Sequence, residues 1–192
     1  WRAMKHRMTQ NDLLRRLPRE RLSLLRELGN LADESGVFLY LVGGVVRDLL
    51  LKRENWDLDL TVEGDGIAFA RLVADRYGAG LSIFERFATA RLVFPDGLKM
   101  DIATTRRESY AQPAVLPTVQ PASIEEDLFR RDFTINAIAM QLNSRQFGHL
   151  FDVFGGQRDL RARALRVLHA GSFQDDPTRI FRAIRFEQRF GF

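Results

Sequence analysis

The sequence has 192 residues, of which 45% are hydrophobic, so it can form the buried core of one domain and part of a second. It contains no cysteine, which excludes disulfides and thiolate metal sites and is typical of a reducing compartment. Because no apolar run approaches ~20 residues and no signal peptide opens the chain, we expect a soluble, cytoplasmic protein with no membrane partner. The net charge of +4 is compatible with polyanionic partners, but also with an ordinary solvated surface.

Taken in chain order, the pattern predicts a helix, a small sheet with interleaved helices, and further helices. Leucines recur at helical spacing over residues 9–35, with a break at Pro18. Three prolines and no periodicity predict a mobile loop at 109–123. Short apolar runs predict strands at 37–42, 57–62, 81–84, 90–94 and 98–103, and amphipathic spacing predicts helices at 45–51, 66–77 and from Pro177 onward. This order indicates an α+β fold.

The stretch WDLDL places two carboxylates, Asp57 and Asp59, one residue apart in a predicted strand. Alternation puts both on one face, where they repel each other unless a divalent cation neutralises them. Mg²⁺ is typically held by one or two carboxylates together with substrate phosphates. Asp101, an acid in the apolar strand LKMDIA, is the candidate third carboxylate of a two-metal phosphoryl-transfer site. Taken alone, the D-x-D pattern is also typical of a polar stripe facing solvent.

The stretch LVGGVVRD places paired glycines, Gly43 and Gly44, between a predicted strand and a predicted helix. Glycines there let backbone N–H groups approach phosphate oxygens without a Cβ in the way. Most such pairs are plain turns. Beside the D-x-D acids, however, the pair favours a site for a nucleoside triphosphate.

Several stretches, in their order along the chain, resemble the motifs of the class II tRNA nucleotidyltransferases. These are the CCA-adding enzymes and their A-adding, CC-adding and bacterial poly(A) polymerase relatives. The resemblance runs from about Gly36 to Phe192 and is carried by LVGGVVRDLLL, WDLDL, RRDFTINAIA, DVFGGQRDL and DDPTRIFRAIRF. It implies a polymerase-beta-like nucleotidyltransferase head, with a small mixed sheet and flanking helices, followed by the start of a helical neck.

The resemblance also implies roles for individual residues. The catalytic metals, Mg²⁺, would be held by Asp57 and Asp59, and Asp101 would join them as a catalytic residue. The nucleotide would be bound by Gly43, Gly44, Arg47, Asp48, Arg131, Asp132, Asn136, Asp175, Asp176, Arg179 and Arg182. Without the other motifs, the RRDFTINA stretch would be interpreted as a salt-bridged helix start. The acids and glycines of DVFGGQRDL would form a turn that joins head to neck and acts as a hinge.

Selection of the base would belong to the stretch DDPTR, where the usual family pattern is E-D-x-x-R and the first acid here is Asp175. Four-residue spacing places Asp175 and Arg179 on one helical face. A carboxylate accepts from the exocyclic amine of cytosine or adenine, and a guanidinium donates to ring acceptors, so the pair could select C or A without a template. An ordinary salt bridge, with Asp176 as the N-cap, explains the same spacing.

The loop after TTRRESY resembles the flexible loop of relatives that add the final A, with Arg106, Arg107 and Glu108 at the positions of its basic and acidic residues. CC-adding relatives tend to lack this loop, so its presence favours A addition.

We expect three parts: an N-terminal helical lead at 1–35, the head domain at 36–150, and a hinge with the beginning of the neck at 151–192. Trp1 in place of Met, and an end just inside the neck, predict a fragment of a longer protein.

The leading hypothesis is an enzyme that adds CMP and/or AMP to the 3′ end of tRNA, with ATP and/or CTP as the other substrate. The alternative is a poly(A) polymerase that extends RNA 3′ ends, which would share every motif. A catalytically silent RNA-binding module has no reason to retain repelling acids. A nucleotidyltransferase acting on a protein or a small molecule has no need of a base-reading pair.

Overall fold

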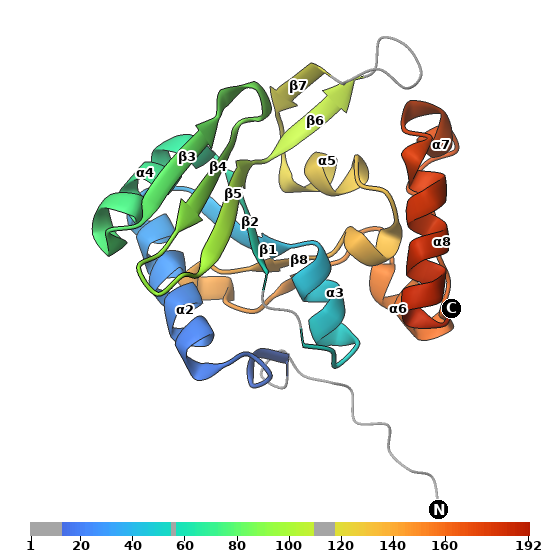
Figure 1. Ribbon diagram of the computed structural model, residues 1–192, viewed down its shortest axis with the longest axis horizontal. Coiled ribbons are helices and arrows are strands. Elements are labelled where there is room, and N and C mark those ends of the chain that lie inside the picture. Colours follow the sequence, from blue (N-terminus) through green and yellow to red (C-terminus); the bar gives the residue numbers. More distant parts are fainter. Residues whose placement is uncertain (1–12, 55–56, 110–117) are drawn as a thin grey trace, which may run out of the picture.

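The computed structural model describes residues 13–54, 57–109 and 118–192, and within them a seven-stranded mixed sheet forms the centre of the molecule (Figure 1). The strand order is β3-β4-β5-β2-β1-β8-β9, in which β2 and β5 are parallel and the other neighbours antiparallel. The strands are β1 (Phe38–Val42), β2 (Leu58–Glu63), β3 (Gly80–Phe84), β4 (Thr89–Val93), β5 (Lys99–Thr104), β8 (Ala139–Gln141) and β9 (Leu150–Phe151). The α+β expectation, with a mixed sheet and flanking helices, is confirmed.

The helices and a second, two-stranded sheet surround this centre. The short sheet pairs β6 (Arg106–Ser109) with β7 (Thr118–Pro121). The α-helices are α2 (Arg19–Glu34), α3 (Gly44–Leu50), α4 (Gly66–Tyr77), α5 (Ile124–Phe129), α6 (Gly156–Ala162), α7 (Ser172–Asp175) and α8 (Thr178–Phe190), and the 3₁₀ turns are η1 (Glu85–Phe87), η2 (Thr134–Asn136) and η3 (Ser144–Gln146). In Figure 1, α7 and α8 form a column at one side, with α3 and α5 between it and the sheet. Among the described residues, every helix is too short or too polar to cross a bilayer.

Helix α4 covers one face of the sheet and thereby decides which side chains of β5 face away from it. The Asp65 carboxylate accepts the Ala68 N–H at 2.9 Å to cap α4, and Gly78 ends the helix in the left-handed conformation. Thr104 Oγ1 accepts the Gly66 N–H at 3.1 Å, so Thr104 faces α4. Because side chains alternate along a strand, Asp101 points to the opposite face. That opposite face carries the polar groups described below.

Two sequence expectations concern the segments at 9–35 and 109–123. The break expected at Pro18 within the helical segment 9–35 is confirmed, since Pro18 directly precedes α2, which starts at Arg19; residues 9–12 lie outside the described residues. The mobile loop expected at 109–123 is wrong at both ends, because Ser109 ends β6, β7 begins at Thr118, and Ser123 caps α5 with a capping box. Residues 110–117 lie outside the described residues.

The residues of the FDVFGGQRDL turn hold α6 and pack it against η2. The Asp152 carboxylate accepts the N–H groups of Gly156 and Gln157 at 2.6 and 3.0 Å, which caps α6. The buried Asp159 carboxylate accepts the Thr134 hydroxyl at 2.7 Å. A Cβ on Gly156 would lie 2.2 Å from the Thr134 carbonyl oxygen, so this position needs glycine. The structure therefore gives these residues a role in packing, and the hinge stays a prediction.

Replacing Gly156 with Ala should destabilise the fold by about 1–3 kcal/mol, because η2 and α6 must separate to admit the methyl group. Urea unfolding followed by circular dichroism measures the loss. Gly80→Ala is the matched control, since its Cβ would meet nothing closer than the Val93 carbonyl oxygen at 3.8 Å. Equal stability of the two variants would contradict the packing role.

Candidate active site

The acids of the D-x-D motif lie on the open face of the sheet, beside the acid of the neighbouring strand. Asp59 is paired in register with Asp101 across the parallel strands β2 and β5. Asp57 directly precedes β2, which begins at Leu58. Loss of hydration raises the pKa of the Asp59 carboxyl, as does the negative charge of Asp101, while Arg131 acts in the opposite direction. The predicted carboxylate group is therefore brought together, although β2 begins one residue later than expected.

Asp101 has a cationic partner that the sequence did not indicate. Arg91 is paired in register with Asp101 across β4 and β5. Its Nε and Nη2 donate to the two carboxylate oxygens at 2.7 and 2.8 Å. Both oxygens of Asp101 are thus engaged by one guanidinium, in the bidentate geometry that is the strongest form of this pair.

The paired glycines form the turn from β1 into α3, next to these acids. Gly43 has φ of 74°, in the left-handed region that favours glycine. A Cβ at this position would lie 3.4 Å from Arg131 Nη1 and 3.8 Å from Asp59 Oδ2. The turn therefore places bare backbone between a cation and a metal-binding candidate, where a phosphate group would fit.

A chain of hydrogen bonds joins α3, η2 and α8 behind this turn. Arg47 donates from Nε to Asp48 Oδ1 at 2.8 Å and from Nη1 to Asn136 Oδ1 at 2.6 Å. The Asn136 amide nitrogen donates to Asp132 Oδ1 at 2.9 Å, and Arg182 Nε donates to Asp132 Oδ2 at 2.8 Å. The RRDFTINA stretch is thus tied to the LVGGVVRD motif through Arg47 and to the DDPTRIFRAIRF motif through Arg182.

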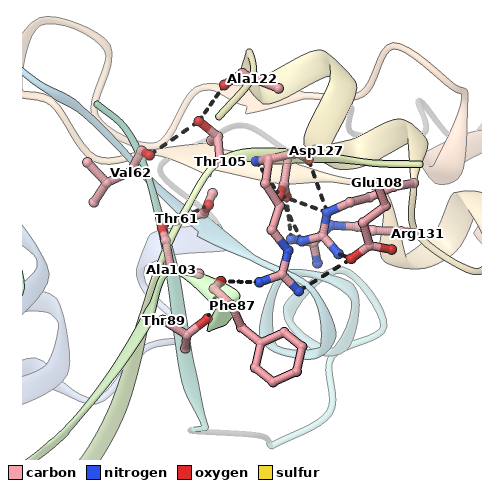
Figure 2. A network of polar contacts seen from close by, with 12 residues as sticks. Thr61, Val62, Phe87, Thr89, Ala103, Thr105, Glu108, Ala122, Asp127 and Arg131 are labelled. Atoms are coloured by element: carbon pink, nitrogen blue, oxygen red, sulfur yellow. Dashed lines mark hydrogen bonds and ion pairs between the residues drawn. The ribbon is translucent and has the colours of Figure 1, made fainter. Parts of the chain in front are cut away.

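A second polar network surrounds Asp127 at the end of α5 (Figure 2). This fully buried carboxylate accepts from Arg130 Nη2 at 2.8 Å and from Arg131 Nη2 at 2.9 Å. Burial acts to raise the pKa of Asp127, but Arg131 and Arg130 outweigh it and hold the pKa below its ordinary value of 3.8. Arg130 also donates to Glu108 Oε1 at 2.9 Å, which attaches the β6–β7 sheet to α5. Within the described ranges, Arg131 Nε is buried and has no hydrogen-bond partner.

These elements enclose a cleft of about 420 Å³ between the sheet and α8, large enough for a nucleotide. The predicted residues that line it are Gly43, Gly44, Arg47, Asp59, Arg131, Asp132, Asn136, Asp176, Arg179 and Arg182. Glu108, Arg130 and Phe186 complete the lining. Asp48 lies behind the cleft, fully buried, and holds Arg47. The cleft therefore gathers residues that are more than 130 positions apart in the sequence.

The predicted pairing of Asp175 with Arg179 on one helical face is wrong. Helix α7 ends at Asp175, Asp176 is extended, and α8 starts at Thr178, so the two residues do not share a helix. Asp175 lines a neighbouring cavity of about 520 Å³, which Arg179 also lines, and its carboxylate lies 3.7 Å from His169 Nε2. Asp176 lines the catalytic cleft with Arg179, and its Oδ2 lies 3.8 Å from Arg179 Nε.

Arg179 is held in place by two further contacts. It donates from Nη1 to Ser172 Oγ at 2.5 Å and from Nη2 to the Arg130 carbonyl oxygen at 2.8 Å. The side chain is 5% exposed, so its guanidinium is fixed at the junction of α5, α7 and α8. Asp176 also accepts the Thr178 N–H at 3.0 Å, but Pro177 is the N-cap residue of α8, so the expected N-cap position is one residue early.

Comparison with known proteins identifies the family. A profile of the poly A polymerase head domain matches residues 39–166, about two thirds of the chain. The chain belongs to the poly A polymerase head domain family. The match begins in β1 and ends shortly after α6, so it contains the glycine turn, the D-x-D acids and the RRDFTINA stretch.

Similar members of this family include proteins named as tRNA nucleotidyltransferases. An A-adding tRNA nucleotidyltransferase of Geobacter sulfurreducens is 56% identical over 93% of this chain and 20% of its own length. The A-adding relative of Halalkalibacterium halodurans is 46% identical over 92% of this chain and 41% of its own. A CC-adding relative of Deinococcus radiodurans is 41% identical over 79% and 40%, respectively. The chain therefore spans less than half the length of each of these relatives.

Solved structures of similar proteins have the same fold. A CCA-adding enzyme in apo form II superposes with a TM-score of 0.91 at 51% identity, over 95% of this chain and 43% of that one. The Thermotoga maritima CCA-adding enzyme complexed with tRNA superposes with a TM-score of 0.83 at 47% identity, over 95% and 41%. This chain thus corresponds to less than half of each of those two structures.

Three residues that shape this head-domain site were not among the sequence candidates. Arg91 engages Asp101, Asp127 anchors two arginines, and Ser172 holds Arg179. A sequence signal existed for Asp127, because arginines follow it three and four positions later, just past the end of a short helix. The cross-strand partner of Asp101 required the register of β4 on β5, and Ser172 required the break between α7 and α8.

Replacing Asp127 with Asn should destabilise the protein by about 3–5 kcal/mol at pH 7, because it leaves two arginines without their buried counter-charge. The folded-state pKa of Asp127 is lowered, so its contribution is complete above its unfolded value of about 3.9 and is lost as the pH falls through the folded value. Urea unfolding across this range should show a constant gap between wild type and variant from pH 7 to 5, and a narrowing gap below pH 4.

The exposed Asp75 on α4 supplies the matched control, since Asp75→Asn removes the same charge. A gap for Asp127→Asn that is no larger than that of the control, or that is unchanged below pH 4, would contradict the assignment.

Proposed function

We propose that this head domain catalyses template-independent transfer of a nucleoside monophosphate from a triphosphate to the 3′ end of tRNA. The observation that carries the proposal is the convergence of ten predicted residues on one cleft beside the Asp59 carboxylate. In the reaction, the oxygen of the RNA 3′ hydroxyl bonds to the α-phosphorus, the bond to the bridging oxygen breaks, and pyrophosphate leaves. The names of the relatives support tRNA as the acceptor.

Backbone groups and guanidinium groups of the cleft would together bind the triphosphate. Gly43 leaves its backbone open to a phosphate, and Arg131 lies next to it with a buried Nε that lacks a protein partner in the described chain. Charge-assisted hydrogen bonds from guanidinium to phosphate are among the stronger polar contacts in proteins. Asp132 and Asn136 hold each other and Arg182 at the α8 side of the cleft, where the sugar would lie.

The carboxylates fit a divalent cation that arrives with its nucleotide. In the described part of the chain, no three His, Cys, Asp or Glu side chains form a ready cage for a metal ion. Mg²⁺ does not need such a cage, because it is usually held by one or two carboxylates together with substrate phosphates. Asp57 and Asp59 would supply those carboxylates, next to the glycine turn. When bound, Mg²⁺ would neutralise charge on the phosphates and favour ionisation of the attacking hydroxyl.

Selection of the base would belong to Asp176 and Arg179 in place of Asp175. Arg179 lines both the catalytic cleft and the neighbouring cavity; Asp176 shares the cleft with it, together with Asp59, and Asp175 shares the cavity. The Arg179 guanidinium is fixed by Ser172 and the Arg130 carbonyl, so it can present donors to a base without rearranging. The pair offers an acceptor and donors side by side, which suits the edges of cytosine and adenine.

Of the two nucleoside monophosphates, AMP is the one that we expect this enzyme to transfer. Relatives named A-adding are 56% and 46% identical to this chain, whereas the CC-adding relative of Deinococcus radiodurans is 41% identical. Incorporation assays with the full-length protein should decide. The primers are tRNAs ending in -N, -NC and -NCC, each with every labelled triphosphate, and an unstructured RNA of equal length is the control. Addition of AMP to -NCC alone supports an A-adding enzyme, and repeated AMP addition to the unstructured RNA supports a poly(A) polymerase.

Replacing Asp57 or Asp59 with Asn should reduce incorporation by at least about a thousandfold, because each variant removes one of two metal-binding carboxylates. Single-turnover incorporation measures the effect, with Asp75→Asn as the control for loss of one surface charge. Retention of more than a tenth of the wild-type rate in either variant would exclude that carboxylate as a metal ligand.

Replacing Asp176 with Asn should relax the preference for CTP and ATP over UTP and GTP by about tenfold to a hundredfold. A bidentate polar contact to a base edge discriminates by ~1–3 kcal/mol, and the amide presents a donor where an acceptor is needed. Competition among the four triphosphates measures the preference. Asp175→Asn is the matched control, one residue away and outside the cleft. Relaxed selection in the control but not in Asp176→Asn would reverse the assignment.

A further inference from the structure

The third carboxylate of the site is engaged by a guanidinium on the strand next to it. Arg91 on β4, Asp101 on β5 and Asp59 on β2 form a row of registered residues on the open face of the sheet. Both Asp101 oxygens accept from Arg91, at 2.7 and 2.8 Å. A metal ion that used Asp101 would therefore have to displace at least one of these two hydrogen bonds.

The pair is placed so that such a displacement is easy. The side chains of Arg91 and Asp101 are 53% and 34% exposed, so water and dissolved ions can compete for both groups of the pair. Arg91 has a long side chain that can leave the carboxylate without disturbing the strand. Its positive charge favours keeping Arg91 on Asp101. Asp101 and Asp59 are registered neighbours, and their negative charges repel each other unless a cation lies close to them.

We propose that Arg91 competes with a divalent cation for the carboxylate of Asp101, so that this third acid joins the metal site only when Arg91 releases it. The inference rests on the proposed function, since it concerns the same carboxylates. Arg91 neutralises Asp101 while no cation is bound, and it raises the cation concentration at which Asp101 can be used. It is a positioning residue, because it acts on the metal site through Asp101.

Mn²⁺ binding in the absence of nucleotide tests this directly, with free Mn²⁺ measured by electron paramagnetic resonance on the full chain. Arg91→Met should lower the Kd for Mn²⁺ by at least about threefold, and Arg91→Lys, which keeps a charge but loses the bidentate contact, should lie between that variant and wild type. Arg91→Met combined with Asp101→Asn should show no gain over Asp101→Asn alone. Arg71→Met is the matched control for loss of one positive charge, because Arg71 is exposed on α4, at the opposite face of the sheet.

The proposal is overturned if neither Arg91 variant binds Mn²⁺ more tightly than wild type. It is also overturned if the gain persists without the Asp101 carboxylate, or if Arg71→Met gains as much, since either result indicates a general charge effect. Circular dichroism and the melting temperature of each variant, with and without Mn²⁺, confirm that folded proteins are compared. Mn²⁺ binding does not depend on nucleotide transfer, so failure of the proposed function in the tRNA assay is distinguishable from failure of this competition.

Discussion

The hydrogen-bonded chain from Asp48 through Arg47, Asn136 and Asp132 to Arg182 holds the candidate site together. It crosses from α3 to η2 to α8, and these three elements form one side of the cleft. Its first four members are at most 7% exposed, so each lost partner would leave a buried polar group unsatisfied. Such a network holds the walls in one arrangement only if all of its members are present. The spacing between the glycine turn and the Asp176–Arg179 pair depends on that arrangement.

Most charged groups of the site are paired with groups of opposite charge, and the less fully paired ones could bind a substrate. Asp127 balances two arginines below the cleft, and Arg91 balances Asp101 on the sheet. Burial of ions is unfavourable unless they are paired, so the buried Asp127 is fixed with its arginines before any ligand is bound, whereas the Arg91–Asp101 pair is open to solvent. Asp59 and the Nε of Arg131 are less fully compensated, since the pKa of Asp59 is raised and the buried nitrogen of Arg131 lacks a partner in the described chain. A cation and a phosphate would each supply what these two groups lack.

Much of the fold and most of the site could be predicted from the sequence, because the signals were local. Caps, alternation and glycines marked β1, β2 and α4, and the motifs of the family include Arg47 and Asp132, which line the cleft. The errors arose where tertiary context decided the outcome. The strands β6 and β7 form because they pair with each other. The chain turns at Asp176 between α7 and α8, so Asp175 and Arg179 belong to different helices.

The central claim is that one cleft binds the triphosphate between the glycine turn and the Asp176–Arg179 pair, with the metal beside Asp57 and Asp59. A crystal structure of this chain with a non-hydrolysable ATP analogue and Mn²⁺ tests it most directly, because the anomalous signal locates the metal independently of the nucleotide. We predict an anomalous peak within bonding distance of the Asp57 and Asp59 carboxylates, phosphates over Gly43, and the base against Asp176. A metal away from both carboxylates, or a base in the cavity that Asp175 lines, would contradict the claim.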